Sequence, residues 1–430
     1  MQTITKPESL KNKLITAFES VKDSLYGDTN LRLQAINSFD KQGIPNRKSE
    51  EYKYVNIELI LKDNFGFYTP SSLTADRIKH TCFLKNATVI VIENGQFSKK
   101  LSADSFPKGL RVVDIKEAGN DNAFATAYAT FADIHADPFI AMNTALANGG
   151  VYIHIADGAV IEAPVHIIHI ASSQANTIIH QRVFIHVGKN AHVNLVQSFE
   201  SVDSTAKTFN NTVTEVVIYE HAVVNQYQIQ DEEAQGYLVN TTQTYQKAKS
   251  VFSINTFTLS GSFVRNNLNM VLDDEYIESH LNGLYLTHDS QVVDNHTLVD
   301  HRKPNCNSNE LYKGIIEDKS SATFNGKIYV RKDAQQTNAF QSNKNILLSD
   351  DGTINTKPQL EIYANDVKCS HGTSTGKLDE DKIFYLRARG LSESSAKKML
   401  MHAFASEVVE KITLEDLRDY VEGKISKRFE

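Results

Sequence analysis

The segment RVFIHVGKNAHVN, residues 182–194, decides the fold of this chain. In its first half apolar residues occupy every second position, and Phe184 and His186 fall between them. This alternation is typical of a β-strand that buries one face. The segment VYIHI at 151–155 shows the same pattern. The sequence therefore predicts β-structure on both sides of the turn at KNAHVN.

This turn recurs at a fixed period. Aligning DGAVIE, KNAHVN and EHAVVN places three alanines in register at nearly equal intervals: Ala159, Ala191 and Ala222. Aligning SQVVDN, SATFNG and GTINTK gives a second series at equal intervals: Gln291, Ala322 and Thr353. The longer interval between the two series leaves room for two slightly longer units. Such a period indicates stacked coils, so we predict a parallel β-helix, with a β-sandwich as second choice.

Helical periodicity flanks the predicted β-helix at both ends of the chain. Near the C-terminus Asp379 and Ser392 are placed as the N-caps of two helices. Thr413 would begin a third helix, with Asp416 completing a capping box. These helices would either cover the open end of the β-helix or form a docking surface. We divide the chain into an N-terminal helical region and linker, a β-helix core and a C-terminal helical region: 1–80, 81–375 and 376–430.

The composition excludes several classes of protein. The formal charge of −7 and the lack of a Lys and Arg cluster argue against binding to nucleic acid. The N-terminal residues are polar, unlike a secretory signal, and no apolar run is long enough to cross a membrane. The three cysteines are odd in number and scattered, which argues against a disulfide framework. A reducing, cytoplasmic location is therefore expected.

The segment VKCSHGTSTG, residues 367–376, is the strongest candidate for a site. Cys369 and His371 are two positions apart, so on a strand they share one face, with Cα atoms about 6.5 Å apart. Cys and His are preferred ligands of transition metals, which makes the pair a candidate metal site. The alternative is a structural cysteine beside a turn histidine, the commoner outcome for such a pair. A nucleophile–base pair would also need an orienting group and an oxyanion hole, for which no motif is present.

No nucleotide site is expected at the following residues. GTSTGK at 372–377 has one residue too few between its glycines for a phosphate-binding loop. It also lacks the Ser or Thr that would hold Mg²⁺, because Leu378 follows the lysine.

The other histidines and cysteines give no pattern of a site. His154, His186 and His192 alternate with apolar neighbours, so we expect them to face solvent. Cys306 lies in the polar stretch HRKPNCNSNE, where its thiol would be accessible, but nothing there indicates activation. Nothing in the sequence assigns a role to Cys82.

Carboxylates at two predicted turns leave an enzyme open as the alternative. The pairs Asp273–Asp274 and Asp350–Asp351 are placed as they would be in a β-helix enzyme that acts on carbohydrate, a polysaccharide lyase or hydrolase. The chain contains no tryptophan, so a sugar-binding cleft would have to use tyrosine.

A long stretch of the C-terminal third carries a resemblance to a known family. NELYKGIIEDKSSATFNGKIYVRKDAQQTNAFQSNKNILLSDDGTINTKPQLEIYANDVKCSHGTSTGKLDEDKIFYLRARG, residues 309–390, resembles the SufB/SufD family of iron–sulfur cluster assembly scaffold proteins. PNRKSEEYKYVNI and VIVIENGQF nearer the N-terminus are similar to its SufD branch. The resemblance covers effectively the whole chain, more weakly in the middle. It implies a right-handed parallel β-helix flanked by helical regions.

The resemblance also implies roles for single residues. The SufB branch has a cysteine implicated in cluster building within the segment aligned with IFYLRARG, and Leu386 occupies that position here. This difference indicates the SufD branch and a chain that does not build a cluster alone. His371 is implied to be a ligand at the interface with SufB, for a transient iron–sulfur cluster or iron. Cys369 is the less clear second candidate.

The partners implied by the resemblance are SufB and the ATPase SufC, which would dock on the C-terminal helical region. On this interpretation the chain is a non-catalytic scaffold subunit, and ATP-driven closure of SufC moves the C-terminal helices and exposes the interface ligands. A homodimer of the isolated chain and a flavin in the assembled complex are further candidates. A purely structural partner of SufB, with a dispensable His371, is a third interpretation.

Overall fold

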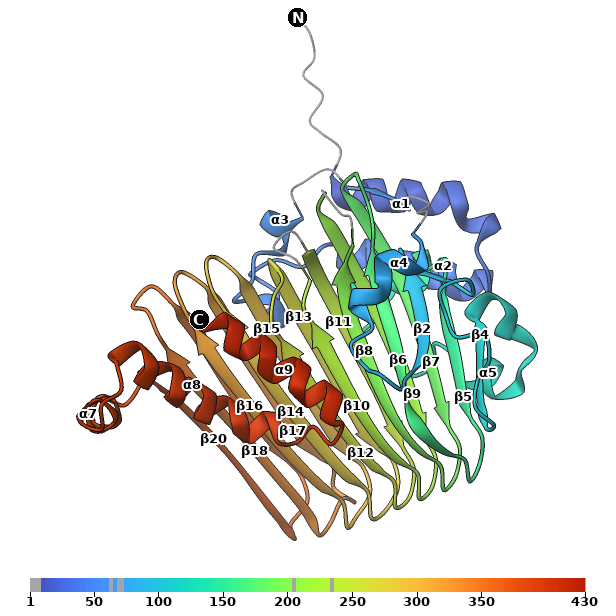
Figure 1. Ribbon diagram of the computed structural model, residues 1–430. Helices are drawn as coiled ribbons and strands as arrows, with labels where there is room; N and C mark the ends of the chain where they lie inside the picture. Colours follow the sequence, from blue (N-terminus) through green and yellow to red (C-terminus); the bar gives the residue numbers. More distant parts are fainter. Residues whose placement is uncertain (1–8, 62–64, 68–72, 203–205, 233–235, 430) are drawn as a thin grey trace, which may run out of the picture.

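The computed structural model describes residues 9–61, 65–67, 73–202, 206–232 and 236–429 (Figure 1). Its core is a parallel β-helix in which each coil adds one strand to each of two sheets, as predicted. From β5 onward, sheet A contains the odd-numbered strands: β5 (Gly150–Ile155), β7 (Thr177–Val187), β9 (Thr208–Ile218), β11 (Gly236–Gln246), β13 (Phe263–Leu272), β15 (Val292–His301), β17 (Ser321–Val330) and β19 (Thr353–Ile362). Sheet B contains the even-numbered ones: β6 (Val160–Ala171), β8 (His192–Ser201), β10 (Val223–Gln230), β12 (Val251–Thr258), β14 (Glu278–Thr287), β16 (Asn307–Ile316), β18 (Thr337–Leu347) and β20 (Val367–Gly376).

The first predicted register is confirmed. The backbone N–H of His192 donates to the carbonyl of Ala159, and that of Val223 to the carbonyl of Ala191. The three aligned alanines therefore precede adjacent strands of sheet B.

The second predicted register is wrong. Ala322 pairs with Val293 and Ile354 rather than with Gln291 and Thr353, and this series belongs to sheet A. The coils between the two series are also shorter than predicted, not longer. Val223 pairs with Val251, and Val251 pairs in turn with Glu278, so both steps are shorter than the step from His192 to Val223. The period varies from coil to coil, so a constant spacing misplaces the later strands.

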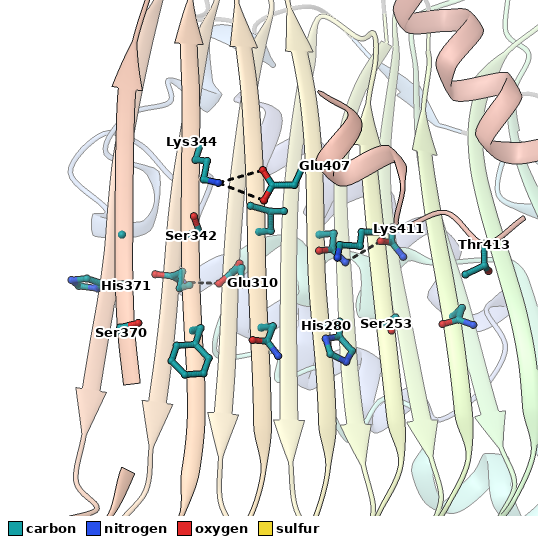
Figure 2. Close-up of a pocket in the computed structure, with 18 residues that line it drawn as sticks. Ser253, His280, Glu310, Ser342, Lys344, Ser370, His371, Glu407, Lys411 and Thr413 are labelled. Atoms are coloured by element: carbon teal, nitrogen blue, oxygen red, sulfur yellow. Dashed lines mark hydrogen bonds and ion pairs between the residues drawn. The ribbon is translucent and has the colours of Figure 1, made fainter. Parts of the chain in front are cut away.

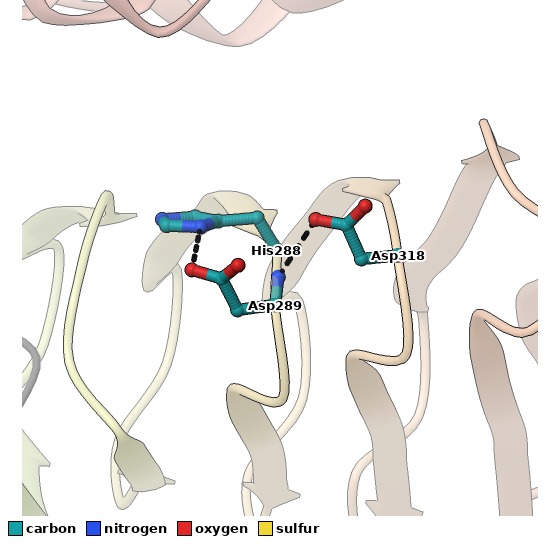
Figure 3. Close-up of side chains that lie close together, drawn as sticks. All are labelled: His288, Asp289 and Asp318. Atoms are coloured by element: carbon teal, nitrogen blue, oxygen red, sulfur yellow. Dashed lines mark hydrogen bonds and ion pairs between the residues drawn. The ribbon is translucent and has the colours of Figure 1, made fainter.

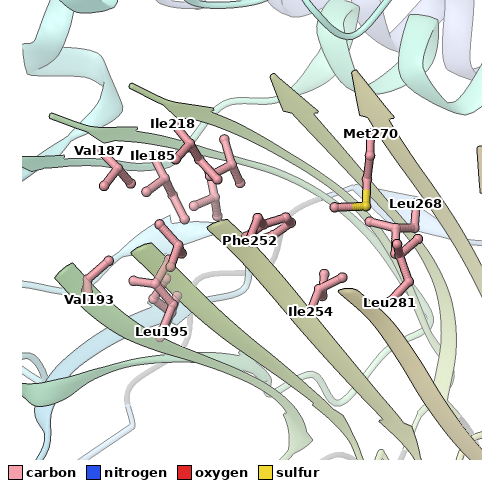
Figure 4. Packing of buried hydrophobic residues seen from close by; sticks show 14 of the residues in the cluster. Ile185, Val187, Val193, Leu195, Ile218, Phe252, Ile254, Leu268, Met270 and Leu281 are labelled. Atoms are coloured by element: carbon pink, nitrogen blue, oxygen red, sulfur yellow. The ribbon is translucent and has the colours of Figure 1, made fainter. Parts of the chain in front are cut away.

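The interior of the β-helix is filled by apolar side chains from both sheets (Figure 4). Ile185 and Met270 from sheet A meet Leu195 and Ile254 from sheet B. Each buried aliphatic side chain contributes roughly 1.5–3 kcal/mol of transfer free energy, which holds the two sheets together. The interior becomes more polar toward β20, where buried residues include Glu310, which is 5% exposed.

Helices near the N-terminus cover the outer face of sheet A. α1 (Leu10–Val21), α2 (Thr29–Gln42), α3 (Ile57–Ile60) and α6 (Pro138–Leu146) form an apolar cluster with residues of β7 to β13. Two further short helices are α4 (Ala75–Ile78) and α5 (Asn122–Ala127). α2 ends at Gln42, and Gly43 follows it in a positive-φ conformation.

Short strands close the N-terminal end of the β-helix. β4 (Leu110–Asp114) adds to β5 in antiparallel direction, and β2 (Thr88–Glu93) with β3 (Gln96–Phe97) continues sheet B. β1 (Gly66–Phe67) pairs with β7. The division of the chain at residues 80 and 375 stays a prediction, and residues 1–8 lie outside the described part.

The C-terminal helices are α7 (Glu380–Ala388), α8 (Glu393–Val409) and α9 (Glu415–Arg428). The predicted caps at Asp379 and Ser392 are confirmed by hydrogen bonds to their own first turns. The capping box at the third helix is wrong, because α9 starts after Leu414. Asp416 instead accepts the backbone N–H of Lys85 at 3.1 Å.

α8 and α9 lie across the outer face of sheet B (Figure 1). Val408 and Leu417 pack there against Ile229, Phe257 and Leu284. The helices therefore do not cover the open end of the β-helix, and the first of the two predicted roles is wrong. None of the described helices combines the length and the apolar character that crossing a membrane requires.

Candidate functional site

The C-terminal end of the β-helix is open. β19 pairs with β17 and β20 with β18, and within the described ranges no strand pairs with the other edge of either. β20 is largely exposed along its length, and β19 is mostly half-buried. The Thr373 hydroxyl donates to Thr356 Oγ1 at 3.2 Å, which joins the two sheets at this end. Unpaired strand edges are templates for further pairing, so this end is a candidate interface.

Cys369 and His371 lie on β20 and share one face, as their spacing predicts. Their register partners on β18 are Ala339 and Gln341, both buried in the interior. Cys369 is half-buried and packs with an apolar cluster that includes Ala339, whereas His371 is exposed. Figure 2 shows His371 on the outermost strand of sheet B, directed away from its neighbours. In the described part of the chain no third metal-binding side chain completes a group with them.

The cysteine thiols are not activated in the isolated chain. Burial raises the pKa of the Cys369 thiol, so little thiolate forms near neutral pH. Cys306 is fully buried, which corrects the expected accessibility: its thiol donates to the carbonyl of Asp274 at 3.1 Å, and burial raises its pKa to about 11. The pKa of half-buried Cys82 is also raised by burial. A thiolate ligand at the open end would therefore come from another chain, or from Cys369 once its surroundings change.

Two residues that the sequence did not predict, Gln341 and Glu310, lie in register with His371 on the preceding coils and lead from it into the interior. Gln341 on β18 is in register with His371, and Glu310 on β16 with Gln341. Gln341 Nε2 donates to Glu310 Oε2 at 2.6 Å (Figure 2). All three residues line one cavity of about 870 Å³. They follow one another at close to the period of one coil, but only a known length for each coil would have placed them in register with His371.

The same cavity extends over the outer face of sheet B beside α8. Asn309, Phe340 and Ser370 line it from adjacent strands. Glu407 of α8 forms ion pairs with Lys313 at 2.5 Å and with Lys344 at 3.3 Å. These pairs tie α8 to β16 and β18, close to the open end.

An exposed apolar surface lies on α7 and the start of α8. It consists of four side chains, Phe384, Tyr385, Leu391 and Met399, of which Phe384 is 74% exposed. Figure 1 places α7 beyond β20, at the open end of the β-helix. Solvent-exposed apolar clusters of this kind are typical of interaction sites. The half-buried Leu386 lies on the same helix.

His288, Asp289 and Asp318 form a second polar cluster, at turns of the β-helix (Figure 3). Their potential ligand atoms lie within 4.8 Å of one another. His288 Nδ1 is 2.8 Å from Asp289 Oδ2, and Asp318 Oδ2 accepts the backbone N–H of Asp289 at 2.9 Å. These contacts account for the arrangement without an ion.

The expectation of solvent-facing histidines is only partly correct. His192 is exposed and His154 is half-buried, but His186 is 8% exposed and stacks on His154, with ring centroids 4.7 Å apart. The segment around Phe124 packs over this part of sheet A and buries its outer face. Sequence alternation identifies the outer face of a strand but not what covers it.

One carboxylate of each predicted turn pair is engaged in ion pairs. Asp273 contacts Lys247 at 3.2 Å and Arg302 at 3.4 Å, and Asp350 contacts Lys377 at 2.6 Å. Burial opposes ionisation of Asp273, but the hydrogen bonds from Tyr245 and Lys247 lower its pKa overall. A glycosidase acid needs a raised pKa, so these contacts do not support the carbohydrate-active alternative.

The segment PNRKSEEYKYVNI fixes the N-terminal region on sheet A. The Tyr52 hydroxyl donates to Asp137, and the centre of its ring lies 3.9 Å from the Arg265 guanidinium carbon. Glu51 pairs with His296 at 3.2 Å. The structure therefore gives this segment a role in packing.

Comparison with known proteins gives matches over nearly the whole chain. The model of the SufBD core domain of the SUF system for FeS cluster assembly matches residues 169–404, and the model of the SufBD N-terminal region matches residues 13–167. The chain is similar to the iron–sulfur cluster assembly protein SufD of Escherichia coli, at 29% identity over 92% of each chain. It is also similar to an iron–sulfur cluster assembly SufBD family protein of Synechocystis, at 28% identity over 93% of this chain and 90% of the relative. Bacillus subtilis SufD is 22% identical over 93% of each chain.

Proposed function

Because the chain belongs to the SufBD family of iron–sulfur cluster assembly proteins and is SufD-like, we propose that it is the SufD-type subunit of a scaffold complex with SufB and the ATPase SufC. Its relatives are named as assembly proteins, and we assign this chain the role of a non-catalytic scaffold. The contacts of the turn carboxylates do not support the alternative function, a β-helix enzyme that acts on carbohydrate, so we do not propose it.

The open end of the β-helix is the observation that carries the proposal. β19 and β20 offer two unpaired edges to a second chain of the same fold, which could continue both sheets. A β-helix needs a cap or a partner at such an end, and α8 and α9 provide no cap because they lie on the side. We assign this end to SufB.

His371 is the ligand that we assign to the interface. It is exposed on β20, and a neutral imidazole suits borderline metals such as iron. Iron and sulfide are the substrates of assembly, and SufB would supply the thiolate that this chain lacks. Cys369 is the second candidate, and it would have to lose its proton on contact with the partner.

SufC is assigned to the apolar surface of α7. Phe384 and Tyr385 give this surface a large hydrophobic area, and Arg389 lies over the Tyr385 ring at 5.3 Å. Because Glu407 ties α8 to β16 and β18, movement of these helices would be transmitted toward the open end. ATP binds to SufC in this scheme, and no nucleotide binds to this chain. The complex works in the cytoplasm, and a flavin would bind only after assembly.

The test of the ligand is anaerobic co-expression of the chain with SufB and SufC, followed by measurement of the iron and sulfide content of the purified complex. We expect His371→Ala to lose most of the cluster while the complex stays intact. Ser370→Ala is the matched control, because Ser370 is adjacent on β20 and faces outward. Full cluster content in a combined His371→Ala and Cys369→Ala variant would refute the ligand role and leave the chain a structural partner.

The docking of SufC is tested separately by affinity purification. Phe384→Ser together with Tyr385→Ser should abolish the association with SufC and leave SufB bound, because the two surfaces are distinct. Tyr276→Ser is the control, since Tyr276 is 54% exposed on a turn of the β-helix. Retention of SufC by the double variant would move the docking site elsewhere.

A further inference from the structure

The interior at the open end contains buried polar atoms without a protein partner. Glu310 Oε1, Gln341 Oε1 and Asn295 Nδ2 are buried and make no hydrogen bond. Glu310 and Gln341 belong to sheet B, and Asn295 belongs to sheet A. Each of these residues is 5% exposed or less. Buried groups of this kind are normally satisfied by ordered water, so the geometry indicates water molecules between the two sheets.

This polar region continues to the surface at His371. The cavity lined by Glu310 and Gln341 is the one that His371 lines at the free edge. Gln341 stands between the other two residues in the row, so Glu310 does not touch His371. On the opposite side, the side-chain carbonyl of Asn295 accepts from Asn266 at 2.9 Å, and that of Asn266 accepts from Gln230 at 2.6 Å. Polar contacts therefore extend from the open end into the β-helix.

Gln341 is held in position by a close approach to the opposite sheet. A Cβ atom added at Gly326 on β17 would lie 2.2 Å from Gln341 Nε2 and 2.7 Å from the Phe324 ring. Only glycine leaves room for the amide there. Its hydrogen bond to Glu310 is therefore fixed by the packing of both sheets.

We propose that Glu310 is a proton-exchanging residue for the open end of the β-helix, connected to it by ordered water beside Gln341. The inference rests on the proposed function, because the site at His371 is what would use the protons. A hydrosulfide, thiol or imidazolium loses a proton when it becomes a metal ligand. The Glu310 carboxylate takes up that proton, becomes the carboxylic acid and later returns the proton to bulk water by the same path. No electrons are transferred.

The chemistry of Glu310 suits this role. Burial raises its pKa to about 7, with Thr297 and Gln341 acting in the opposite sense, so both protonation states are populated at neutral pH. The titratable group that faces it is Tyr312 on the same strand, whose own pKa is raised well above 10 by burial. The neighbouring interior positions on β14, β15 and β18 are uncharged: Leu281, Thr297 and Gln341.

The first test uses the isolated chain without metal. Infrared titration of the wild type should show a buried carboxylic acid that loses its proton near pH 7 and exchanges rapidly in D₂O. Glu310→Gln should remove this band. Glu232→Gln is the control that should retain it, because Glu232 is also buried, with a pKa raised by burial to about 8, but lies in contact with Asn210. Gly326→Ala should keep the band and slow the exchange, because it displaces Gln341.

A component titrating near pH 7 that survives in Glu310→Gln, or that exchanges slowly in the wild type, would overturn the inference. The carboxylic acid of Glu232, whose pKa burial raises to about 8, is expected to remain. The second test is the pH profile of cluster formation in the full complex. We expect Glu310→Gln to lose the inflection near pH 7, whereas His371→Ala loses cluster at every pH. An unchanged profile in Glu310→Gln beside a cluster-free His371→Ala would refute the inference alone. Full cluster content in the combined His371→Ala and Cys369→Ala variant would refute the ligand role at the open end, and the infrared result would still decide the exchange at Glu310.

Discussion

Buried histidines are a feature of this β-helix at the scale of single residues. Five of them have pKa values lowered by burial, to about 3 for His166 and His180 and to about 4 for the other three: His169, His186 and His301. His166 and His301 each lie 2.9 Å from a serine hydroxyl, Ser198 and Ser308. Neutral imidazoles are therefore part of the packed structure.

The stability of the chain should fall in acid because of these histidines. The unfolded chain takes up a proton at each histidine near pH 6.5, whereas the folded chain does not until about pH 4. Each such group removes about 1.4 kcal/mol of unfolding free energy per pH unit across that window. Unfolding in urea as a function of pH measures this slope. His301→Gln should reduce this slope, whereas His192→Gln, at an exposed histidine, should leave it unchanged.

The sequence identified the residues at the free edge but not those behind them. His371 and Cys369 are close in sequence, so the period of a strand places them on one face. Glu310 is more than one coil away, and its relation to His371 depends on the length of each coil. A buried glutamate also has no local signature, because its raised pKa comes from burial by the opposite sheet.

At the scale of elements, corners of the β-helix place residues other than glycine in the left-handed conformation. Asn190, His221 and Lys249 have φ values of 55°, 60° and 57° at the same corner of successive coils. Their backbone N–H groups donate to carbonyls of the next coil, which orders the stack. The left-handed conformation costs a non-glycine residue about 1–2 kcal/mol, so the stacking contacts must offset this cost.

Lys249→Gly should therefore stabilise the chain. Glycine removes the left-handed strain and loses about 0.5–1 kcal/mol through backbone entropy, which leaves a gain of up to about 1.5 kcal/mol. Thermal unfolding measures the gain. Lys319→Gly is the control, since Lys319 lies at an exposed turn and is not among the described residues with positive φ. It should lose stability, and a loss in both variants would contradict the account.

These turns also explain the error in the predicted register. The early coils share an alanine after the left-handed residue, and this repeat is visible in the sequence. The later corners use other residues, such as Tyr276 and Gln336, also with positive φ. Without a shared turn residue and with coil lengths that vary, the sequence could indicate the architecture but not the pairing of each strand.

One hydroxyl fixes the connection between α8 and α9. The backbone N–H of Thr413 donates to the Tyr227 hydroxyl at 3.2 Å, and Thr413 Oγ1 lies 2.9 Å from it. Tyr227→Phe should loosen this connection by about 1–2 kcal/mol, in line with the loss of two hydrogen bonds. Hydrogen exchange of the amides around Thr413 should become faster. Tyr385→Phe, on the exposed face of α7, should leave it unchanged, and equal exchange in both variants would show that the hydroxyl is dispensable.

At the scale of the whole molecule, the two ends of the β-helix differ. The N-terminal end is closed by antiparallel strands, whereas the C-terminal end presents β19 and β20. The parallel β-helix and its helical flanks followed from the period and the family resemblance. The position of α8 and α9 did not, because an amphipathic helix shows that it has a partner face but not which surface provides it.

The open end should also control self-association. In the absence of partners, we expect two copies of the chain to meet through β19 and β20, which would give the candidate homodimer of the isolated chain. Thr373→Arg places a charged side chain in this end and should shift the chain to a monomer in light scattering. Asn122→Arg adds the same charge on α5 and should leave the dimer intact. A dimer that persists in Thr373→Arg would place the contact elsewhere.

The covering of sheet B by α8 and α9 has a consequence for biosynthesis. Both helices are translated after every strand that they cover, so the apolar outer face formed by Ile229, Phe257 and Leu284 has no cover while the β-helix assembles on the ribosome. A nascent chain interrupted before residue 393 would contain a complete β-helix, but the apolar outer face of sheet B would be exposed. Such a product is the form that chaperones and proteases would recognise, so premature termination near this point should yield degradation rather than a partly active protein.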